Sequence, residues 1–591
     1  MCGIVGRTGY SLAASIILQG LQSLEYRGYD SAGMVTFSDG KLWLKKDVGW
    51  VADVDRKHHL QHLPGETGIG HVRWATHGGT TPENAHPHLD CTGRVAVVHN
   101  GIVENYQELR HRLGARHRFI SETDTEVIPH LIEEYLEDGH LLEEAVRLAS
   151  QQLIGSYAFV VMYSEEPGKL VGTRRDNPLV AGVASKGLFL ASDALAFLEH
   201  TDQVLYPDDG EVVVLNGSGE VRCLDSQGNP VVRHPTPLGW SVQAASKSGY
   251  DFFMLKEIME QPQTIRSALK QDPEHIDSLA LDILRARQVI ITACGTSRYA
   301  ALVGRYLFSR LAGKFCDVVM ASELHYFSDS IDKNTLVTAV SQSGETSDVV
   351  QGVKQARANG ARILSLVNTP GSQLCRISDW VITLNCGPEI SVAATKSFVN
   401  QMVVFYLLAS AMMSPRNGIM HKMDDISHLI EKNIRDTSDT VRTVAEATFT
   451  REHFYYIARG INFAIAVEGA LKVKELAYIH AEGMPAGELK HGTLALIEEG
   501  TPVVVICPQD YTFQETLSNA MEARSRGGLI IGVSDQPNPV FHHWLPIPNV
   551  DEIYYPLVSV APLQLLAYHL SVLRGRNPDR PRNLAKSVTV K

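Results

Sequence analysis

The second residue of the chain is a cysteine, and this position gives it more chemistry than a thiol alone. Removal of Met1 would leave Cys2 with a free α-amine, whose reference pKa of about 7.7–8.0 keeps a useful share neutral near pH 7. One residue would then supply both a nucleophile and the base that activates it. A penultimate cysteine without a role is the alternative, and Cys2 alone does not decide between them.

Three later segments carry groups that suit an amide substrate. Arg73 opens the segment Arg-Trp-Ala-Thr-His-Gly, and its guanidinium can clamp a carboxylate with two hydrogen bonds. Asn100 and Gly101 follow a predicted strand and offer an amide and a glycine N–H, the parts of an oxyanion hole. Asp124 could hold an ammonium group. Taken singly, these residues could instead be a surface charge, a hairpin turn and a helix N-cap.

In this order, the segments resemble the class II glutamine amidotransferase domain, the N-terminal nucleophile glutaminase, over residues 1 to about 235. The resemblance implies that Cys2 forms a γ-glutamyl thioester and that Asn100 and Gly101 hold the oxyanion. It implies that Arg73 and Asp124 grip the α-carboxylate and α-amine of glutamine. The loop that closes over glutamine would carry Trp74, Thr76 and His77.

His86 and His88 have a spacing that could suggest a metal site. Pro87 lies between them, and the mechanism of the resembled family uses no metal. We therefore expect structural roles for both histidines and no metal.

Hydroxyl-rich turns follow two predicted strands further along the chain. One turn contains Thr296 and Ser297, and the other is Ser-Gln-Ser-Gly-Glu-Thr at 341–346. Hydroxyls and N–H groups at a helix N-terminus suit a phosphate dianion, although ordinary helix capping would use the same residues. The two turns would adjoin in a parallel sheet, which favours one shared phosphate.

Acid–base groups come later still. Glu468, Lys472 and Glu475 fall on one face of a predicted helix, where the alternative is an exposed stripe of ion pairs. His491 lies in a glycine-flanked loop. Lys586 lies in an apolar C-terminal tail, which indicates a docked terminus rather than a frayed one.

The elements that must position these residues fall into two kinds. Residues 1–235 are β-rich, with strands expected at 68–72, 95–99 and 158–163 and a helix at 125–136. Beyond a polar linker, short β-branched runs alternate with helix-length segments and recur after roughly 165 residues. We expect an α/β multidomain protein: an αββα N-terminal nucleophile domain (1–235), a linker (236–255), two doubly wound parallel-sheet domains (256–430 and 431–580) and a tail (581–591).

The repeated domains resemble sugar isomerase (SIS) domains, and the whole chain is similar to the family of glutamine-dependent sugar-phosphate aminotransferases. The resemblance implies glutamine and fructose 6-phosphate as substrates, glucosamine 6-phosphate and glutamate as products, and the first committed step of amino-sugar synthesis. Thr493 and Lys591 depart from the usual pattern without touching a catalytic side chain. The phosphate would be bound by Thr296, Ser297, Ser341, Gln342, Ser343 and Thr346.

The resemblance also assigns the acid–base groups. Lys586 would form a Schiff base with C2 of the open-chain ketose, and Glu475 would move a proton from C1 to C2. His491 would open the sugar ring and can come from the partner subunit of a homodimer, while Lys472 assists and Glu468 positions it. Ammonia would pass through an internal channel gated by Trp74, with no metal or organic cofactor.

Bulk properties exclude several other classes. The chain has 591 residues and a net charge of −12, which argues against a nucleic-acid or membrane-surface binder. No apolar run reaches the ~20 residues of a membrane span, and the eight cysteines show no zinc-type spacing, so a cytoplasmic protein is expected. A different ketose phosphate as acceptor stays open. A sugar-phosphate-binding regulator and an amidophosphoribosyltransferase are disfavoured by the catalytic residues and by the repeat.

Overall fold

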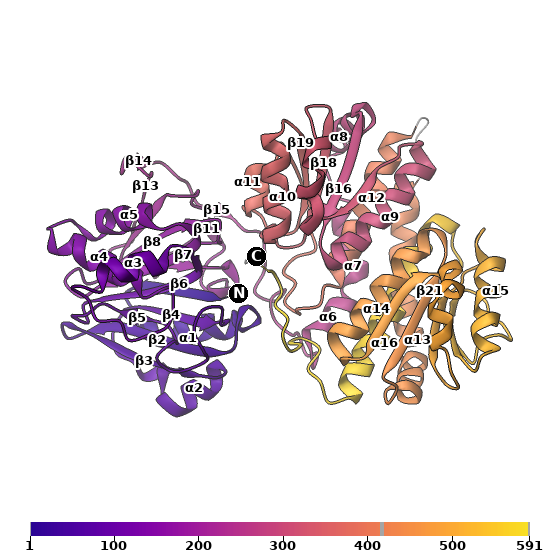
Figure 1. Cartoon of the computed structure of the whole chain (residues 1–591), viewed down its shortest axis with the longest axis horizontal. Coiled ribbons are helices and arrows are strands. Elements are labelled where there is room, and N and C mark those ends of the chain that lie inside the picture. The colour runs from indigo at the N-terminus through magenta and orange to yellow at the C-terminus, as the bar shows by residue number, and fades with distance from the viewer. Residues whose placement is uncertain (1, 414–418, 589–591) are drawn as a thin grey trace. The chain divides into compact units, whose positions relative to one another are not determined.

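The computed structural model describes residues 2–413 and 419–588 (Figure 1). The chain divides into two compact units. Of the described residues, the first comprises 2–245 together with 587 and 588, and the second comprises those from Ser246 to Lys586.

The first unit contains two antiparallel sheets. In the described chain, an eight-stranded sheet has the order β15, β11, β9, β10, β1, β4, β2, β3, and a seven-stranded sheet has the order β14, β13, β12, β8, β7, β6, β5. The strands are β1 (Gly3–Gly9), β2 (Ser31–Ser38), β3 (Lys41–Val48), β4 (Thr67–Arg73), β5 (His88–Leu89), β6 (Val95–Val103), β7 (Gly155–Tyr163), β8 (Lys169–Arg175), β9 (Val180–Ala184), β10 (Gly187–Ala191), β11 (Gln203–Leu205), β12 (Val212–Asn216), β13 (Glu220–Leu224), β14 (Pro230–Val231) and β15 (Thr236–Pro237).

Helices cover the outer faces of these two sheets. Helices α1 and α2 lie on the eight-stranded sheet, and α3, α4 and α5 lie on the seven-stranded one. Their bounds are α1 (Ala13–Ser23), α2 (Val51–His58), α3 (Tyr106–Leu113), α4 (Val127–Glu137) and α5 (Leu142–Gln152). Alternating apolar residues of both sheets, such as Ile4, Ile69 and Val160, fill the layer between them. The unit is therefore the expected αββα sandwich.

The second unit contains two parallel five-stranded sheets. Its strands are β16 (Gln288–Ala293), β17 (Asp317–Met320), β18 (Thr335–Ser341), β19 (Arg362–Val367), β20 (Trp380–Thr383), β21 (His453–Ala458), β22 (His480–Pro485), β23 (Pro502–Ile506), β24 (Leu529–Ser534) and β25 (His543–Pro546). Its helices are α6 (Phe253–Met259), α7 (Gln261–Ala268), α8 (Pro273–Arg285), α9 (Gly295–Ala312), α10 (Ser347–Ala358), α11 (Gln373–Ile377), α12 (Lys396–Met412), α13 (Ile419–Thr448), α14 (Phe463–Ala477), α15 (Phe513–Arg524) and α16 (Tyr555–Leu573).

The two sheets of this unit repeat one topology. The first has the order β17, β16, β18, β19, β20, and the second has the order β22, β21, β23, β24, β25, with every pairing parallel. The repeat expected from the sequence is thereby confirmed. The expected boundary between the two repeats, at residue 430, lies inside helix α13, which runs continuously through it.

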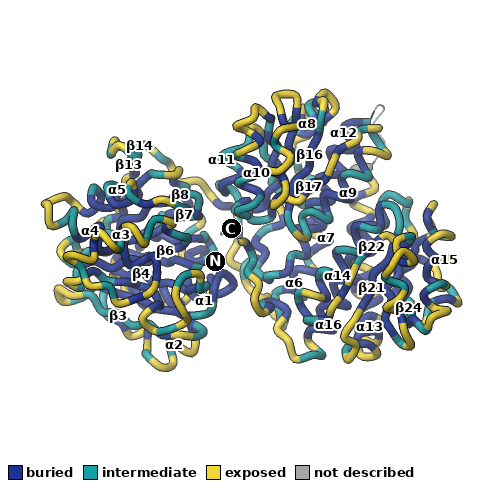
Figure 2. Tube along the Cα trace, viewed as in Figure 1, coloured by how far each residue is buried: buried dark blue, intermediate teal, exposed yellow. Residues whose placement is uncertain are grey.

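A shared core joins the two repeats, and buried residues concentrate along its helices (Figure 2). One stretch of the described chain, Glu552–Leu573, is long and apolar enough to cross a membrane, and 83% of its most apolar window is buried inside the protein. Helix α16 within that stretch is buried along nearly its whole length. It packs as a core helix against α13 and α14.

Candidate active sites

Cys2 lies at the start of β1 and contacts the backbone of Trp74, just after β4. The Trp74 N–H donates to the Cys2 Sγ at 3.3 Å, and the thiol donates to the Trp74 carbonyl at 3.5 Å. Burial raises the pKa of the Cys2 thiol, against the lowering by that N–H and by the charge of Arg73. The thiol is therefore protonated at rest and needs a base to become a nucleophile.

The Asn100 carboxamide lies beside Cys2. Its Nδ2 donates to the Cys2 carbonyl at 3.0 Å, and its Oδ1 is 3.1 Å from the ring nitrogen Nε2 of His71. Gly101 has φ +119°, and a Cβ at this position would lie 2.0 Å from the Ser156 carbonyl oxygen. Only glycine fits there.

Two alternative readings of these segments are wrong. Asn100 and Gly101 lie inside β6, paired with Ala158 and Tyr157, and so form neither a hairpin turn nor the end of a strand. Asp124 does not cap α4, because its Oδ2 accepts the Val103 N–H at 2.7 Å instead. This bond ties Asp124 to the strand that carries Asn100.

Arg73 is buried, which excludes the surface-charge reading. Its guanidinium donates to the carbonyls of His77, Gly78 and Gly79, at 2.5, 3.3 and 3.1 Å. Burial lowers the pKa of Arg73, while the charges of Cys2, Asp30 and Asp124 oppose that shift. The guanidinium thus holds the loop that follows β4. In this loop Thr76 is exposed, and Trp74 and His77 are half-buried.

Four buried histidines pack beside the residues of this candidate site. The His99 Nδ1 lies 2.8 Å from the Thr125 hydroxyl, and the His88 Nε2 lies 3.2 Å from the Thr123 hydroxyl. His71 and His86 stack with their ring centroids 4.1 Å apart. Burial lowers the pKa of all four, for His71 to about 3, so they are neutral hydrogen-bonding groups on either side of Asp124.

In the second unit, β16 and β18 are neighbours, with Ala293 opposite Val340. The hydroxyl-rich turns that follow them therefore share one edge of the sheet. The Ser341 and Thr346 hydroxyls are 3.0 Å apart, and Ser341 also accepts the Gly344 N–H at 3.1 Å. On the neighbouring turn, Ser297 accepts a hydrogen bond of 2.9 Å from Gln401 on α12. Gln342 and Ser343 lie on the Ser341 turn.

The acid–base stripe of α14 is buried, so the exposed ion-pair reading is wrong. The Lys472 Nζ lies 2.6 Å from Glu475 and 3.6 Å from Glu468, and the Lys472 and Glu468 side chains are 1% and 0% exposed. Burial raises the pKa of Glu468 to about 8, while the carboxylates raise the pKa of Lys472 against its own burial. The Glu475 side chain is 22% exposed.

One hydrogen bond joins the two repeats at this point. The Thr296 hydroxyl, on the first hydroxyl-rich turn, donates to the Glu468 Oε1 at 3.4 Å. Thr296 belongs to α9 and Glu468 to α14, which is the corresponding helix of the second repeat. The candidate phosphate site and the acid–base helix are thus in contact.

Lys586 is buried in an ion pair that the sequence did not reveal. Its Nζ lies 2.5 Å from the Glu389 Oε2, with 4% and 0% of the two side chains exposed. Burial alone would raise the pKa of Glu389, but the Lys586 ammonium and the N–H groups of Ser397 and Thr395 hold it at about 2. The apolar tail is docked at Lys586.

His491 ends the short helix η6 (Ala486–His491) and is exposed. No hydrogen bond among the described residues joins it to Lys472, Glu475 or Lys586.

Arg27 is a residue beside Cys2 that was not predicted from the sequence. Its Nε donates to the Cys2 carbonyl at 3.1 Å, and its Nη1 pairs with Asp193 at 3.5 Å. Arg27 belongs to the motif Leu-Glu-Tyr-Arg-Gly-Tyr-Asp, which could have signalled its role.

The folds and sites define a class of protein, a glutamine amidotransferase joined to a pair of sugar isomerase domains. The family model of the glutamine amidotransferase domain matches residues 71–199, and that of the SIS domain matches residues 282–411 and 449–574. The chain is 46% identical, over all of both chains, to the glutamine–fructose-6-phosphate aminotransferase [isomerizing] of Thermococcus kodakarensis and to that of Methanothermobacter thermautotrophicus. It belongs to the glutamine–fructose-6-phosphate aminotransferase family.

A solved structure agrees with this family. The C-terminal domain of glucosamine-fructose-6-phosphate aminotransferase from Francisella tularensis matches with a TM-score of 0.53 and 33% identity, over 57% of this chain and all of that one. The family that the sequence motifs indicated is confirmed.

Proposed function

We propose that this chain transfers the amide nitrogen of glutamine to fructose 6-phosphate, releasing glutamate and glucosamine 6-phosphate. The hydrogen bond from Thr296 to Glu468 carries this proposal, because it links a phosphate-binding turn to an acid–base helix. Family membership supports both substrates.

In the glutaminase half, Cys2 attacks the carboxamide carbon of glutamine after the α-amine takes its thiol proton. The Asn100 amide and the Gly101 N–H stabilise the developing oxyanion, and the contact of Asn100 with the Cys2 carbonyl supports this role. Ammonia leaves as the thioester forms, and water then releases glutamate. Arg73 binds the α-carboxylate, Asp124 binds the α-amine, and Trp74, Thr76 and His77 close over the substrate.

In the sugar half, the phosphate is held by hydroxyls and N–H groups of the two turns: Thr296, Ser297, Ser341, Gln342, Ser343 and Thr346. His491 opens the ring, and its exposure on the single chain suits a role contributed across a homodimer. Lys586 forms a Schiff base at C2 with loss of water, and ammonia displaces the lysine to leave the C2 imine.

Glu475 then takes the C1 proton and returns it to C2, while the O1 hydroxyl loses a proton and the nitrogen gains one, which converts the ketose imine into the amino aldose. This role suits its partial exposure and its contact with the Lys472 ammonium at 2.6 Å. Glu468 holds Lys472 in place from the other side. An internal path gated by Trp74 keeps ammonia from becoming ammonium in water, where it would lose its nucleophilicity. We also propose that the enzyme is cytoplasmic, with a glutaminase domain followed by two SIS domains.

Product analysis tests this function. Purified chain is given fructose 6-phosphate and glutamine, and Cys2→Ala is given glutamine or ammonium. Equal amounts of glucosamine 6-phosphate and glutamate, with the glutamine-driven reaction lost in Cys2→Ala and the ammonium-driven one retained, would support both halves. Glutamate without amino sugar would overturn the acceptor and direct attention to other ketose phosphates.

A further inference from the structure

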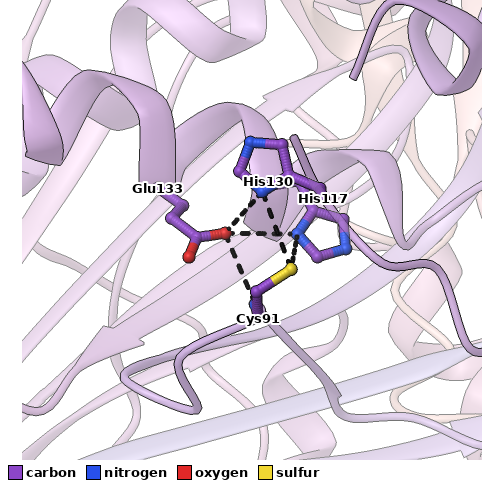
Figure 3. Close-up of side chains that lie close together, drawn as sticks. All are labelled: Cys91, His117, His130 and Glu133. Carbon is purple, nitrogen blue, oxygen red and sulfur yellow. Dashed lines mark hydrogen bonds and ion pairs between the residues drawn. The ribbon is translucent and has the colours of Figure 1, made fainter. Parts of the chain in front are cut away.

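Four potential metal ligands converge in the first unit, away from Cys2 (Figure 3). Cys91 lies on the loop between β5 and β6, and His117 follows α3. His130 and Glu133 lie one turn apart on α4. Their nearest ligand atoms all lie within 4.8 Å of one another.

The distances within the cluster suit a common ion. The Cys91 Sγ lies 3.7 Å from the His117 Nδ1 and 3.8 Å from the His130 Nδ1. The Glu133 Oε2 lies 2.9 Å from the His117 Nδ1 and 3.3 Å from the His130 Nδ1. Tetrahedral zinc sites have ligand bonds of about 2.0–2.3 Å, which corresponds to about 3.3–3.8 Å between neighbouring ligand atoms. Three of these distances fall in that range, and the His117–Glu133 contact of 2.9 Å would widen when the ion binds.

Burial and charge also fit a divalent ion. The His117, His130 and Glu133 side chains are 5%, 1% and 4% exposed, while Cys91 is exposed and leaves a path from solvent. A thiolate, a carboxylate and two neutral imidazoles carry two negative charges, so a dication makes the buried site neutral. The Arg118 N–H donates to the Cys91 Sγ at 3.2 Å and so orients the sulfur within the cluster.

A network without metal accounts for less of this geometry. Both histidines could pair with Glu133 through their Nδ1 atoms, but this pairing gives the Cys91 sulfur no reason to lie against both rings. The His117 Nε2 has the Glu134 carboxylate 3.7 Å away. A carboxylate beside the outer nitrogen is the usual support for a metal-binding histidine.

We propose that Cys91, His117, His130 and Glu133 bind one divalent transition metal of the zinc type as a structural site. Four protein ligands leave no open position, which is typical of structural rather than catalytic zinc. Two of the ligands, His117 and His130, flank the segment that carries Asp124. The ion therefore pins both ends of the connection from α3 to α4, which carries a residue of the proposed glutamine site.

Metal binding is measured on the full chain. The protein is stripped with a chelator, reloaded with Zn²⁺, dialysed and analysed for metal content. We expect one equivalent per chain, lost in Cys91→Ser and His130→Gln. The exposed neighbour His111, on α3, provides the matched control His111→Ala, which should retain the ion. A circular dichroism spectrum verifies that each variant is folded.

Thiol protection gives a second readout that does not depend on activity. In a Cys2→Ala background, Cys91 is the only exposed cysteine among those described. Zn²⁺ should slow its modification by a disulfide reagent at least tenfold, and Co²⁺ should produce a thiolate charge-transfer band. Metal lost on dialysis, metal held equally by Cys91→Ser, or unchanged thiol reactivity would each overturn the proposal. These results are independent of whether glutamine is the substrate.

Discussion

The Lys586 ammonium lies 2.5 Å from the Glu389 carboxylate, and both side chains are almost completely buried. Lys586 comes from the C-terminal tail, whereas Glu389 lies in the loop before α12. Nearly two hundred residues of sequence therefore separate the proposed Schiff-base lysine from the group that holds it in place. The Ser397 hydroxyl donates to the same Glu389 oxygen at 2.7 Å, which fixes the carboxylate in turn.

Replacement Glu389→Gln should reduce amination of fructose 6-phosphate by at least about tenfold and leave glutaminase activity unchanged. Removing one partner of a buried ion pair costs about 3–5 kcal/mol, so Lys586 should leave its pocket. Borohydride trapping of the Schiff base should fall in parallel with turnover. Faster trapping would show that the ion pair restrains Lys586 rather than positioning it. Glu260→Gln, which removes the partner of Lys396, is the matched control.

Replacement Glu475→Gln should lower the rate of amino-sugar formation by about 10²–10⁴-fold, the usual contribution of a general base. Hydrolysis of glutamine should persist, since Glu475 belongs to the second unit. Exchange of the C1 proton of fructose 6-phosphate with deuterated water isolates this step. The exposed neighbour Lys474 on the same helix offers Lys474→Ala as a control, and an equal loss in that variant would count against a specific role.

Replacement Asn100→Ala should lower the kcat for glutamine hydrolysis by about 10²–10³-fold, as removal of one oxyanion donor does. Amination driven by ammonium should be unaffected. Gly101→Ala should fail more severely, because its Cβ would meet the Ser156 carbonyl at 2.0 Å and shift β6. If Asn100→Ala changes only the KM for glutamine, the side chain binds substrate and does not stabilise the transition state.

The buried histidines make the first unit sensitive to acid. The pKa of His71 is lowered to about 3 by burial, against about 6.5 in the unfolded chain. The folded state disfavours protonation of His71. The contribution of neutral His71 to the free energy of unfolding is therefore fully present above pH 6.5 and is lost as the pH falls towards 3. The loss reaches about 1.4 kcal/mol per pH unit for each such histidine.

Hydrogen exchange of amides in β4 and β6 of the full chain, measured at several pH values, reads out this loss for the first unit. In His71→Gln the pH dependence should be shallower by about one proton. A pH dependence that His71→Gln leaves unchanged would mean that His71 does not carry the effect.

The sequence predicts the fold well where local pattern determines it. The alternation of β-branched runs with helices was enough to find both SIS repeats, and the expected strands at 68–72, 95–99 and 158–163 lie within β4, β6 and β7. Local sequence patterns do not predict contacts between segments that are distant in the chain. Glu389 carries no motif, and nothing near it indicates a partner in the tail. Cys91, His117 and His130 have no familiar ligand spacing, and only the one-turn step from His130 to Glu133 was a local signal.

The context of single residues was also hard to predict. Asn100-Gly101 is typical of a hairpin turn, but the left-handed φ of Gly101 is accommodated within a paired strand. The spacing of Glu468, Lys472 and Glu475 gives a common helix face, but not whether that face meets water or another domain. Burial against α9 and α16 decides the matter here.

The matching strand orders of the two parallel sheets indicate an ancestral gene duplication whose copies then specialised. Helices α9 and α14 each follow the second strand of their sheet order, yet one begins with the hydroxyls of Thr296 and Ser297 and the other carries the buried Glu468 and Lys472. The Thr296–Glu468 contact is where these two descendants meet. Because the two copies carry different side chains at these positions, the loss of such a residue from one copy cannot be compensated by the other.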